Sequence, residues 1–152
     1  MSDRLSLTLY ADSDGFITYE CPFCGSAFKL KAADINDEEF PIQELFCPYC
    51  GLTDSPERFL SSEAMGALET LAHNYVAQML NQQFWKMARD INRKNGFISM
   101  KFKPKNIEPE KGVCDKDTTE TIFHCVACEK EVKIQSSTGL SKAFCPYCGV
   151  DL

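Results

Sequence analysis

Two segments of the chain alternate apolar and polar residues around a pair of cysteines. They read ITYECPFCGSAFKL at residues 17–30 and TIFHCVACEKEVKI at residues 121–134. In both segments, apolar residues stand four and six positions after the second cysteine: Phe28, Leu30, Val132 and Ile134. A period of two is typical of short strands with one buried face. The pattern therefore predicts a strand on each side of both cysteine pairs.

A longer segment has the period of an α-helix. No proline or glycine occurs between Ala67 and Asn95, and apolar residues recur there at steps of three and four. Ser61 and Ser62 offer N-terminal caps, and Gly96 follows a basic last turn. The pattern predicts one helix of about 30 residues. Its apolar stripe comprises Leu68, Leu71, Ala72, Tyr75, Val76, Met79, Leu80, Phe84, Met87, Ala88 and Ile91.

This stripe has three interpretations. It packs on the chain's own core, or it binds a partner protein or a second copy, or the helix breaks near residues 81–83 and forms a hairpin. Two small cysteine-rich modules can cover only part of such a helix, so we favour a protein partner or a homodimer. The residues expected at that interface are Leu68, Leu71, Tyr75, Val76, Met79, Leu80, Phe84, Met87 and Ile91.

A basic run spans the end of the helix and the residues after it. Its bases are Lys86, Arg89, Arg93, Lys94, Lys101, Lys103 and Lys105, and Asp90 is its one acid. FISMKFKPK alternates at residues 97–105, which predicts a short strand that Pro104 ends. Trp85, Phe97 and Phe102 lie among the bases, so the run is a candidate nucleic-acid site. The alternative is a solvated helix end followed by a basic strand edge.

Composition favours a reduced, metal-binding protein. The 152 residues include nine cysteines, and no apolar stretch approaches the length of a membrane helix or signal core. We therefore expect a cytoplasmic location without membrane contact, where thiols stay reduced and metal is favoured over disulfides. The net charge of −6 disfavours nucleic-acid binding by the whole chain, although residues 57–112 carry +3.

Eight of the cysteines form four CxxC pairs. Two residues between cysteines allow one tight turn to direct both sulfurs at one ion, and three of the pairs are followed by a glycine that suits such a turn. Zinc prefers four ligands in a tetrahedron, so two pairs suffice for each ion. We predict two Zn²⁺ per chain. The ligand sets are Cys21, Cys24, Cys47 and Cys50, and then Cys125, Cys128, Cys145 and Cys148.

The motifs CPFCG, CPYCG, CVAC and a second CPYCG resemble those of zinc-ribbon proteins with rubredoxin-like knuckles, including transcription factor IIB-type ribbons. The resemblance covers roughly half of the chain. It implies two four-cysteine zinc ribbons built from short β-hairpins, and it leaves the function open because ribbons serve many roles. Iron in the same sites, or redox chemistry by the CxxC pairs, remain alternatives.

The two copies differ in their turns and loops. Twenty-two residues separate Cys24 from Cys47 but sixteen separate Cys128 from Cys145. We expect the six extra residues in the loop that contains Asp34, Asp37, Glu38 and Glu39. CVACE lacks the proline and glycine of the other pairs, which predicts a looser turn. Cys114 has no nearby partner and reads as a free thiol, while His124 reads as a strand residue or an alternative ligand.

These patterns predict a small metal-stabilised α+β protein in which a long helix joins two ribbons. The expected segments are a ribbon at 1–56, the helix at 57–96, a basic strand or linker at 97–112 and a ribbon at 113–152. Four cysteines saturate each zinc, and no catalytic motif occurs, so we expect no enzyme activity. We expect an adaptor that mediates protein assembly through its central helix and ribbons, with a nucleic-acid-binding or transcription-associated role of the basic run 86–105 as the alternative.

Overall fold

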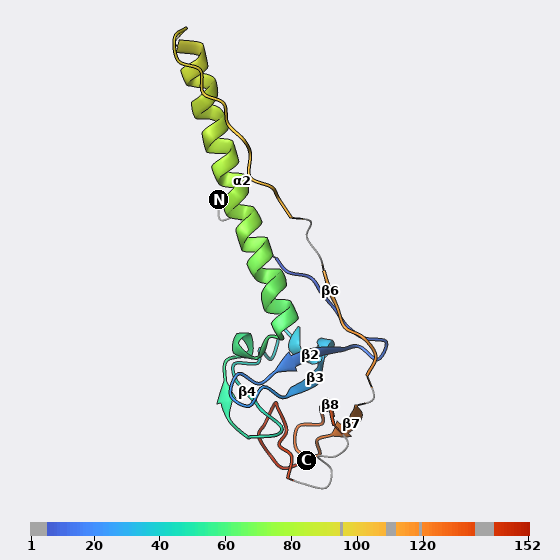
Figure 1. The fold of residues 1–152 in the computed structure, drawn as a ribbon. Coiled ribbons are helices and arrows are strands. Elements are labelled where there is room, and N and C mark those ends of the chain that lie inside the picture. The colour runs from blue at the N-terminus through green and yellow to red at the C-terminus, as the bar shows by residue number, and fades with distance from the viewer. Residues whose placement is uncertain (1–5, 95, 109–111, 119, 136–141) are drawn as a thin grey trace. The chain divides into compact units, whose positions relative to one another are not determined.

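The computed structural model describes residues 6–94, 96–108, 112–118, 120–135 and 142–152 (Figure 1). Contacts group the chain into two compact units. The cysteine unit comprises Thr8–Met65 with Gly112–Leu152, and the helical unit comprises Gly66–Lys111 with Met1–Leu7. Both copies of the cysteine repeat therefore belong to one unit, and the helical unit is an insertion between them. The four-segment division expected from the sequence stays a prediction.

A four-stranded antiparallel sheet forms the centre of the cysteine unit. Its order is β2 (Phe16–Glu20), β3 (Ala27–Lys31), β8 (Glu131–Ile134) and β7 (Thr121–His124). The strands expected from the alternation are confirmed. Each repeat supplies one antiparallel pair, and β3 and β8 join the pairs at the middle of the sheet, where Lys29 lies opposite Lys133.

Short elements complete the cysteine unit. In the cysteine unit, β1 pairs parallel to β6, and β4 pairs antiparallel to β5. Their bounds are β1 Leu9–Tyr10, α1 Ala32–Ile35, β4 Leu45–Phe46, β5 Thr53–Asp54, the 3-10 helix η1 Pro56–Phe59 and β6 Val113–Cys114. Together with the long helix α2, they make a small α+β protein.

One hydrophobic core serves both halves of the cysteine unit. Phe28 and Leu30 from β3 are fully buried, and so are Val132 and Ile134 from β8. All four belong to a single apolar cluster that also contains Phe59, whose ring packs edge-on against Phe28. Because each repeat is too small to build such a core alone, their union supplies apolar burial that separate ribbons would lack.

The sheet also buries two lysines, which its alternation alone would place in solvent. Lys29 and Lys133 are 2% and 3% exposed, and both donate to the same oxygen of Asp12 at 3.0 Å. Lys133 also pairs with Asp14 at 2.7 Å. The other oxygen of Asp12 accepts the amide of Phe16. One carboxylate thus ties together the central strands of the two repeats.

The duplicated FCPYCG motifs contact each other reciprocally. The amide of Phe46 donates to the carbonyl of Pro146, and the amide of Phe144 donates to that of Pro48, at 2.8 and 2.9 Å. A methyl group at Gly149 would lie 3.0 Å from a ring carbon of Phe46. Gly51 has the same relation to Phe144. The repetition of six residues therefore reflects an approximate twofold contact, in which each motif is the other's packing partner.

The helical unit contains α2 (Ser62–Lys94), which begins in the cysteine unit. Ser61 caps it, since its hydroxyl accepts the Ala64 amide at 3.2 Å. The prediction of one long helix is confirmed. The hairpin alternative is wrong, because α2 continues without interruption through residues 81–83. Asn81 instead uses its side chain to hold another segment.

That segment, residues 97–108, is named the strap. Three asparagines of α2 each accept one backbone amide of the strap and donate to the carbonyl of the same residue. The pairs are Asn74 with Glu108, Asn81 with Lys105, and Asn92 with Met100. Eighteen helical residues span about 27 Å, and eight extended residues span about 26 Å. The strap therefore runs extended and antiparallel to α2.

The strap does not form the short strand expected from its alternation. The structure assigns residues 97–108 to no strand, because their described hydrogen bonds go to asparagine side chains. Phe102 stacks on Phe84 with ring centroids 5.5 Å apart. Ala77 and Ala88 are 2% and 8% exposed. Polar clamps and small side chains thus let the strap lie close to one face of α2.

Candidate metal centres

The first four cysteines converge on one point. The sulfurs of Cys21 and Cys50 lie 3.7 Å apart, and those of Cys24 and Cys47 lie 3.6 Å apart. All four sulfurs lie within 4.8 Å of one another. A tetrahedron with metal–sulfur bonds of about 2.3 Å has sulfur–sulfur edges of about 3.8 Å. The donor set therefore fits a tetrahedrally coordinated metal ion, whereas disulfide bonds would need much shorter distances.

The second four cysteines repeat this geometry. Cys125 and Cys148 place their sulfurs 3.7 Å apart, and Cys128 and Cys145 place theirs 3.6 Å apart. These four also lie within 4.8 Å of one another. The structure thus brings together both sets that the spacing predicts, and each set can hold one metal ion.

Tight turns position the sulfurs. In the first turn, the amide of Gly25 donates to the carbonyl of Cys21 at 2.9 Å. The amides of Phe23 and Cys24 point at the Cys21 sulfur from 3.4 and 3.5 Å. Gly25 has a φ of 73°, a conformation that glycine adopts without steric cost. Backbone N–H groups thereby stabilise negative charge on the sulfur that begins the turn.

The CVACE turn closes in the same way despite its different sequence. Glu129 donates its amide to the carbonyl of Cys125 at 2.9 Å, as glycine does in the other turns. Its φ is 58°, and among the described residues it is the one non-glycine with positive φ. The expectation of a looser turn is therefore wrong, because Glu129 accepts the strained conformation.

Each cluster combines buried and more accessible thiols. Burial raises the pKa of the Cys47 and Cys145 thiols. Burial also acts to raise the pKa of Cys24, but hydrogen bonds from Ser26 outweigh it and lower the pKa to about 7. Amides of Cys128 and Ala127 likewise bring the pKa of Cys125 to about 7. Each site thus offers a thiolate near neutral pH, and a bound cation would favour ionisation of the rest.

Other residues that the sequence singled out lie apart from the clusters. Cys114 is an exposed free thiol in β6. His124 pairs with Glu131 across β7 and β8, and it is in neither sulfur cluster. The loop with the extra acidic residues contains α1. Its counterpart at residues 136–141 lies outside the described residues, so the expected placement of the insertion stays a prediction.

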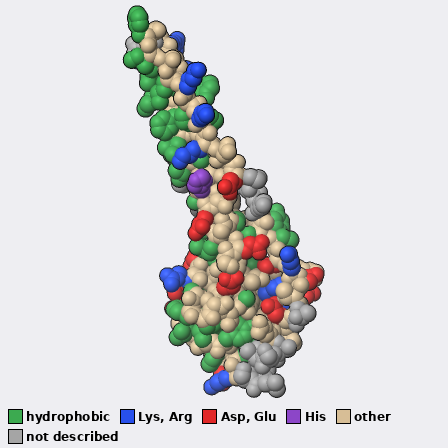
Figure 2. All heavy atoms as spheres, viewed as in Figure 1, with side chains coloured by type: hydrophobic (Ala, Val, Ile, Leu, Met, Phe, Trp, Pro, Cys, Tyr) green, Lys and Arg blue, Asp and Glu red, His purple; other side chains and the backbone are tan. Residues whose placement is uncertain are grey.

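Most residues of the predicted partner interface are accessible on α2. Val76, Met79, Phe84 and Met87 are exposed, at 53%, 48%, 38% and 52%. Leu68, Tyr75, Leu80 and Ile91 are half-buried, and Leu71 is buried. Figure 2 shows apolar side chains along the length of the helical unit. The predicted stripe therefore retains a large apolar area open to contact.

All seven residues of the predicted basic site are exposed. They are Lys86, Arg89, Arg93, Lys94, Lys101, Lys103 and Lys105. Trp85 is 62% exposed, while Phe102 is partly covered by its stacking on Phe84. Lysine and arginine side chains lie beside the apolar ones in Figure 2, in the half of α2 near its C-terminal end. The structure leaves these bases free to meet an anionic surface.

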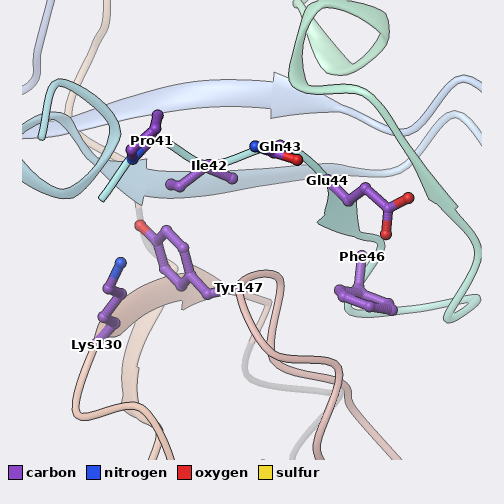
Figure 3. A pocket seen from close by; sticks show the side chains of 7 residues that line it. All are labelled: Pro41, Ile42, Gln43, Glu44, Phe46, Lys130 and Tyr147. Atoms are coloured by element: carbon purple, nitrogen blue, oxygen red, sulfur yellow. The ribbon is translucent and has the colours of Figure 1, made fainter. Parts of the chain in front are cut away.

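A shallow pocket that the sequence did not suggest lies in the cysteine unit (Figure 3). Its lining residues are Pro41, Ile42, Gln43, Glu44, Phe46, Lys130 and Tyr147. The Lys130 ammonium lies 4.7 Å from the centroid of the Tyr147 ring. Because the first five residues precede Cys47 and the last two belong to the second repeat, the pocket depends on the pairing of the two halves.

Comparisons with known proteins leave the relationship of the chain open. The chain matches no protein-family model, and neither the curated proteins nor the solved structures contain a match to it. Within the described residues, no helix combines the length and the apolar character needed to cross a membrane.

Proposed function

We propose that the two clusters hold structural Zn²⁺ and that the protein is a non-enzymatic adaptor whose helical unit binds another protein chain. Four thiolates in a tetrahedron suit zinc, and they leave no coordination position for water or substrate. The resemblance of the four turns to zinc-ribbon knuckles supports the same assignment. Zinc would then add folding free energy to a unit of modest size.

The adaptor role rests on the exposed apolar side chains of α2. Val76, Met79 and Met87 are each about half exposed, and they recur at helical spacing over three turns. An apolar strip of this kind marks an interaction surface in a soluble protein. Helix-in-groove or helix-on-helix contacts use such anchors at steps of three, four and seven residues.

Sedimentation and partner capture test this role. Val76→Glu places a charge in the strip without removing a buried group, so we expect loss of self-association or of a bound partner at unchanged zinc content. Gln78→Glu, an exposed change on another side of α2, is the matched control. A wild-type protein that neither self-associates nor retains any protein through Val76 would contradict the adaptor role.

Elemental analysis of protein purified without added metal tests the zinc assignment. We expect two zinc ions per chain. Iron together with a red colour would show that the sites hold iron instead of zinc. One ion or none per chain would contradict the ligand sets. Redox chemistry by the CxxC pairs predicts reversible disulfides in the native protein, which thiol titration of the metal-free chain would reveal.

A second candidate, nucleic-acid binding, is favoured by the surroundings of Trp85. This exposed ring shares one side of α2 with Lys86, Arg89 and Arg93, which follow it by one, four and eight residues. Bases around an exposed aromatic ring suit the backbone and stacked bases of a single strand. Titration with single-stranded RNA and DNA at two salt concentrations, with Trp85→Ala as the variant, separates this role from the adaptor role.

A further inference from the structure

The strap occupies one face of α2 and determines where a partner can lie. Asn74, Asn81 and Asn92 are spaced by seven and eleven residues, so they form a single line along the helix. Ala77 and Ala88 are buried on this same side. Any second chain must therefore bind elsewhere on the helix.

The opposite face carries the accessible apolar residues. At 100° per residue, Val76 lies about 160° around the helix from Asn74. Met79, Leu80 and Met87 lie within about 60° of Val76, and Met79 and Met87 are about half exposed. We name this the free face of α2. Exposed Gln83 lies about 20° from Val76 and is the polar residue of this face between Leu80 and Met87.

Charged side chains lie at the two ends of the free face, and their signs determine which partner can bind there. Glu69 lies at one end, and Asp90 and Lys94 lie at the other; all three are exposed. His73 lies one turn from Glu69 at the edge of the face. A partner must offer charges in the complementary order, together with apolar groups between them.

A second copy of the chain meets this requirement when the two helices run antiparallel. We infer that α2 pairs with α2 of another copy through the free face, in the register that places Glu69 opposite Lys94. The same register places Val76 opposite Met87, and His73 opposite Asp90. The inference rests on the proposed adaptor role and names the partner.

Two other arrangements of two copies bring like charges together. A parallel pair would set Glu69 against Glu69 and Lys94 against Lys94. An antiparallel pair shifted by about one turn would set Glu69 against Asp90. Like charges at close positions destabilise helix contacts by about as much as opposite charges stabilise them. The antiparallel register with Glu69 beside Lys94 avoids both conflicts, and twofold symmetry forms each favourable pair twice.

A charge swap in the full-length zinc-loaded protein tests this pairing by sedimentation. Glu69→Lys and Lys94→Glu each turn two favourable pairs into two repulsive ones, so each should weaken the dimer by about tenfold. The double variant Glu69→Lys/Lys94→Glu restores opposite charges and should return the dimer close to wild-type affinity. Arg89→Glu makes the same charge change as Lys94→Glu outside the free face and should leave the dimer unchanged.

The outcomes separate the pairing from the adaptor role. A dimer that weakens with each single change and recovers in the double variant supports the pairing. A dimer without recovery overturns the register, and a monomeric wild type overturns self-pairing. A monomer that still holds a different protein through Val76 overturns self-pairing alone, whereas a monomer that holds none overturns the adaptor role as well. Zinc content and helical circular dichroism of every variant establish that it is folded.

Discussion

The two units of this protein differ in how they arrange their large apolar side chains. The cysteine unit buries a cluster of large apolar residues that includes Phe28 and Phe59, and it buries two lysines as well, although Phe40 and Val126 at its surface are exposed. The helical unit leaves Val76 and Met87 half exposed and buries the polar Asn74, which is 4% exposed. The cysteine unit is therefore stabilised by a core of its own, whereas the helical unit presents a row of half-exposed apolar side chains that is suited to contact.

The two units also differ in the interactions that stabilise them. In the cysteine unit, a shared core and a buried ionic cluster connect the two repeats, and each repeat contains one sulfur cluster. In the helical unit, backbone bonds of α2 and the asparagine clamps order the chain. Changes in the first should therefore act on the whole cysteine unit, and changes in the second should act locally.

The largest expected effect follows from breaking one sulfur cluster. Cys47→Ser removes a fully buried sulfur from the first cluster. Because the repeats share one core, we expect the variant to lose its first metal ion and to hold the second more weakly. Elemental analysis after dialysis against a weak chelator, with near-ultraviolet circular dichroism, measures both effects. Cys114→Ser is the control, and retention of two ions in Cys47→Ser would show that Cys47 is no ligand.

The buried ionic cluster gives the next effect. Asp12→Asn leaves buried Lys29 without its carboxylate and leaves Lys133 with Asp14, and an uncompensated buried charge costs about 3 to 5 kcal/mol. Asp14→Asn removes a carboxylate that is 59% exposed and should cost less than about 1 kcal/mol. Urea unfolding of both variants measures the costs, and equal values would contradict the assigned role of Asp12.

This cluster also predicts a pH dependence. Burial alone would raise the pKa of the Asp12 carboxyl, but hydrogen bonds from Phe16, Lys29 and Lys133 hold the pKa well below its ordinary value of 3.8. A lowered folded-state pKa stabilises the protein fully above the unfolded-state value and loses that stabilisation below it. The difference in unfolding free energy between wild type and Asp12→Asn should therefore stay constant from pH 8 to 5 and narrow below about pH 4.

A smaller effect tests the contact between the two FCPYCG motifs. Gly51→Ala forces a side chain into a φ of 72° and against the Phe144 ring. Gly25→Ala meets a similar φ of 73° with open space around it. We expect a cost of about 1 to 2 kcal/mol for Gly25→Ala and about 1 kcal/mol more for Gly51→Ala. Equal costs in denaturant unfolding would mean that the ring contact contributes nothing.

The helical unit should respond locally. Asn81→Ala removes both hydrogen bonds to Lys105, a net loss of about 1 kcal/mol. Hydrogen exchange of the Lys105 amide should accelerate, whereas Glu108 keeps its clamp from Asn74. Gln82→Ala, an exposed change one position along α2, is the control. Release of the whole strap by Asn81→Ala would show that the clamps act together rather than separately.

The smallest expected effect is a gain in stability. Glu129 has a φ of 58° at the position where the other three turns have glycine. Glu129→Gly should relieve this strain, and after the entropy cost of glycine it should stabilise the protein by about 0.5 kcal/mol. Thermal unfolding of the zinc-loaded protein checks the direction. A destabilised variant would show that the Glu129 side chain contributes more than its backbone strain costs.

Local sequence patterns predicted much of this structure. The CxxC spacing identified both sulfur clusters, since a turn of four residues determines where two sulfurs point. The alternation around Phe28 and the helical period up to Lys94 predicted the main strands and α2. In each case the physical cause lies within a few residues of the effect, so a single sequence suffices to reveal it.

Features that depend on residues far apart in the chain could not be predicted from the sequence. Lys29 and Lys133 read as solvent-facing because Asp12 lies 17 and 121 residues away from them. Asn81 reads as an ordinary polar residue, since its clamp is completed by Lys105, 24 residues later. The union of the repeats across β3 and β8 likewise has no local signal. The long helix between the two cysteine repeats suggested two separate ribbons. The repeats instead pair their strand edges in one sheet and pack their apolar faces in one core.

The insertion of the helical unit between the two repeats sets an order of events during synthesis. Cys21 to Cys50 leave the ribosome together, so the first sulfur cluster is complete while its counterpart is still untranslated. At about 5 to 20 residues per second, roughly 100 further residues take about 5 to 20 s to reach Cys148. During that interval the β3 edge and the Phe46 ring have no partner. If the first cluster binds metal as proposed, loading at this stage would stabilise the nascent first half while its open strand edge still lacks a partner.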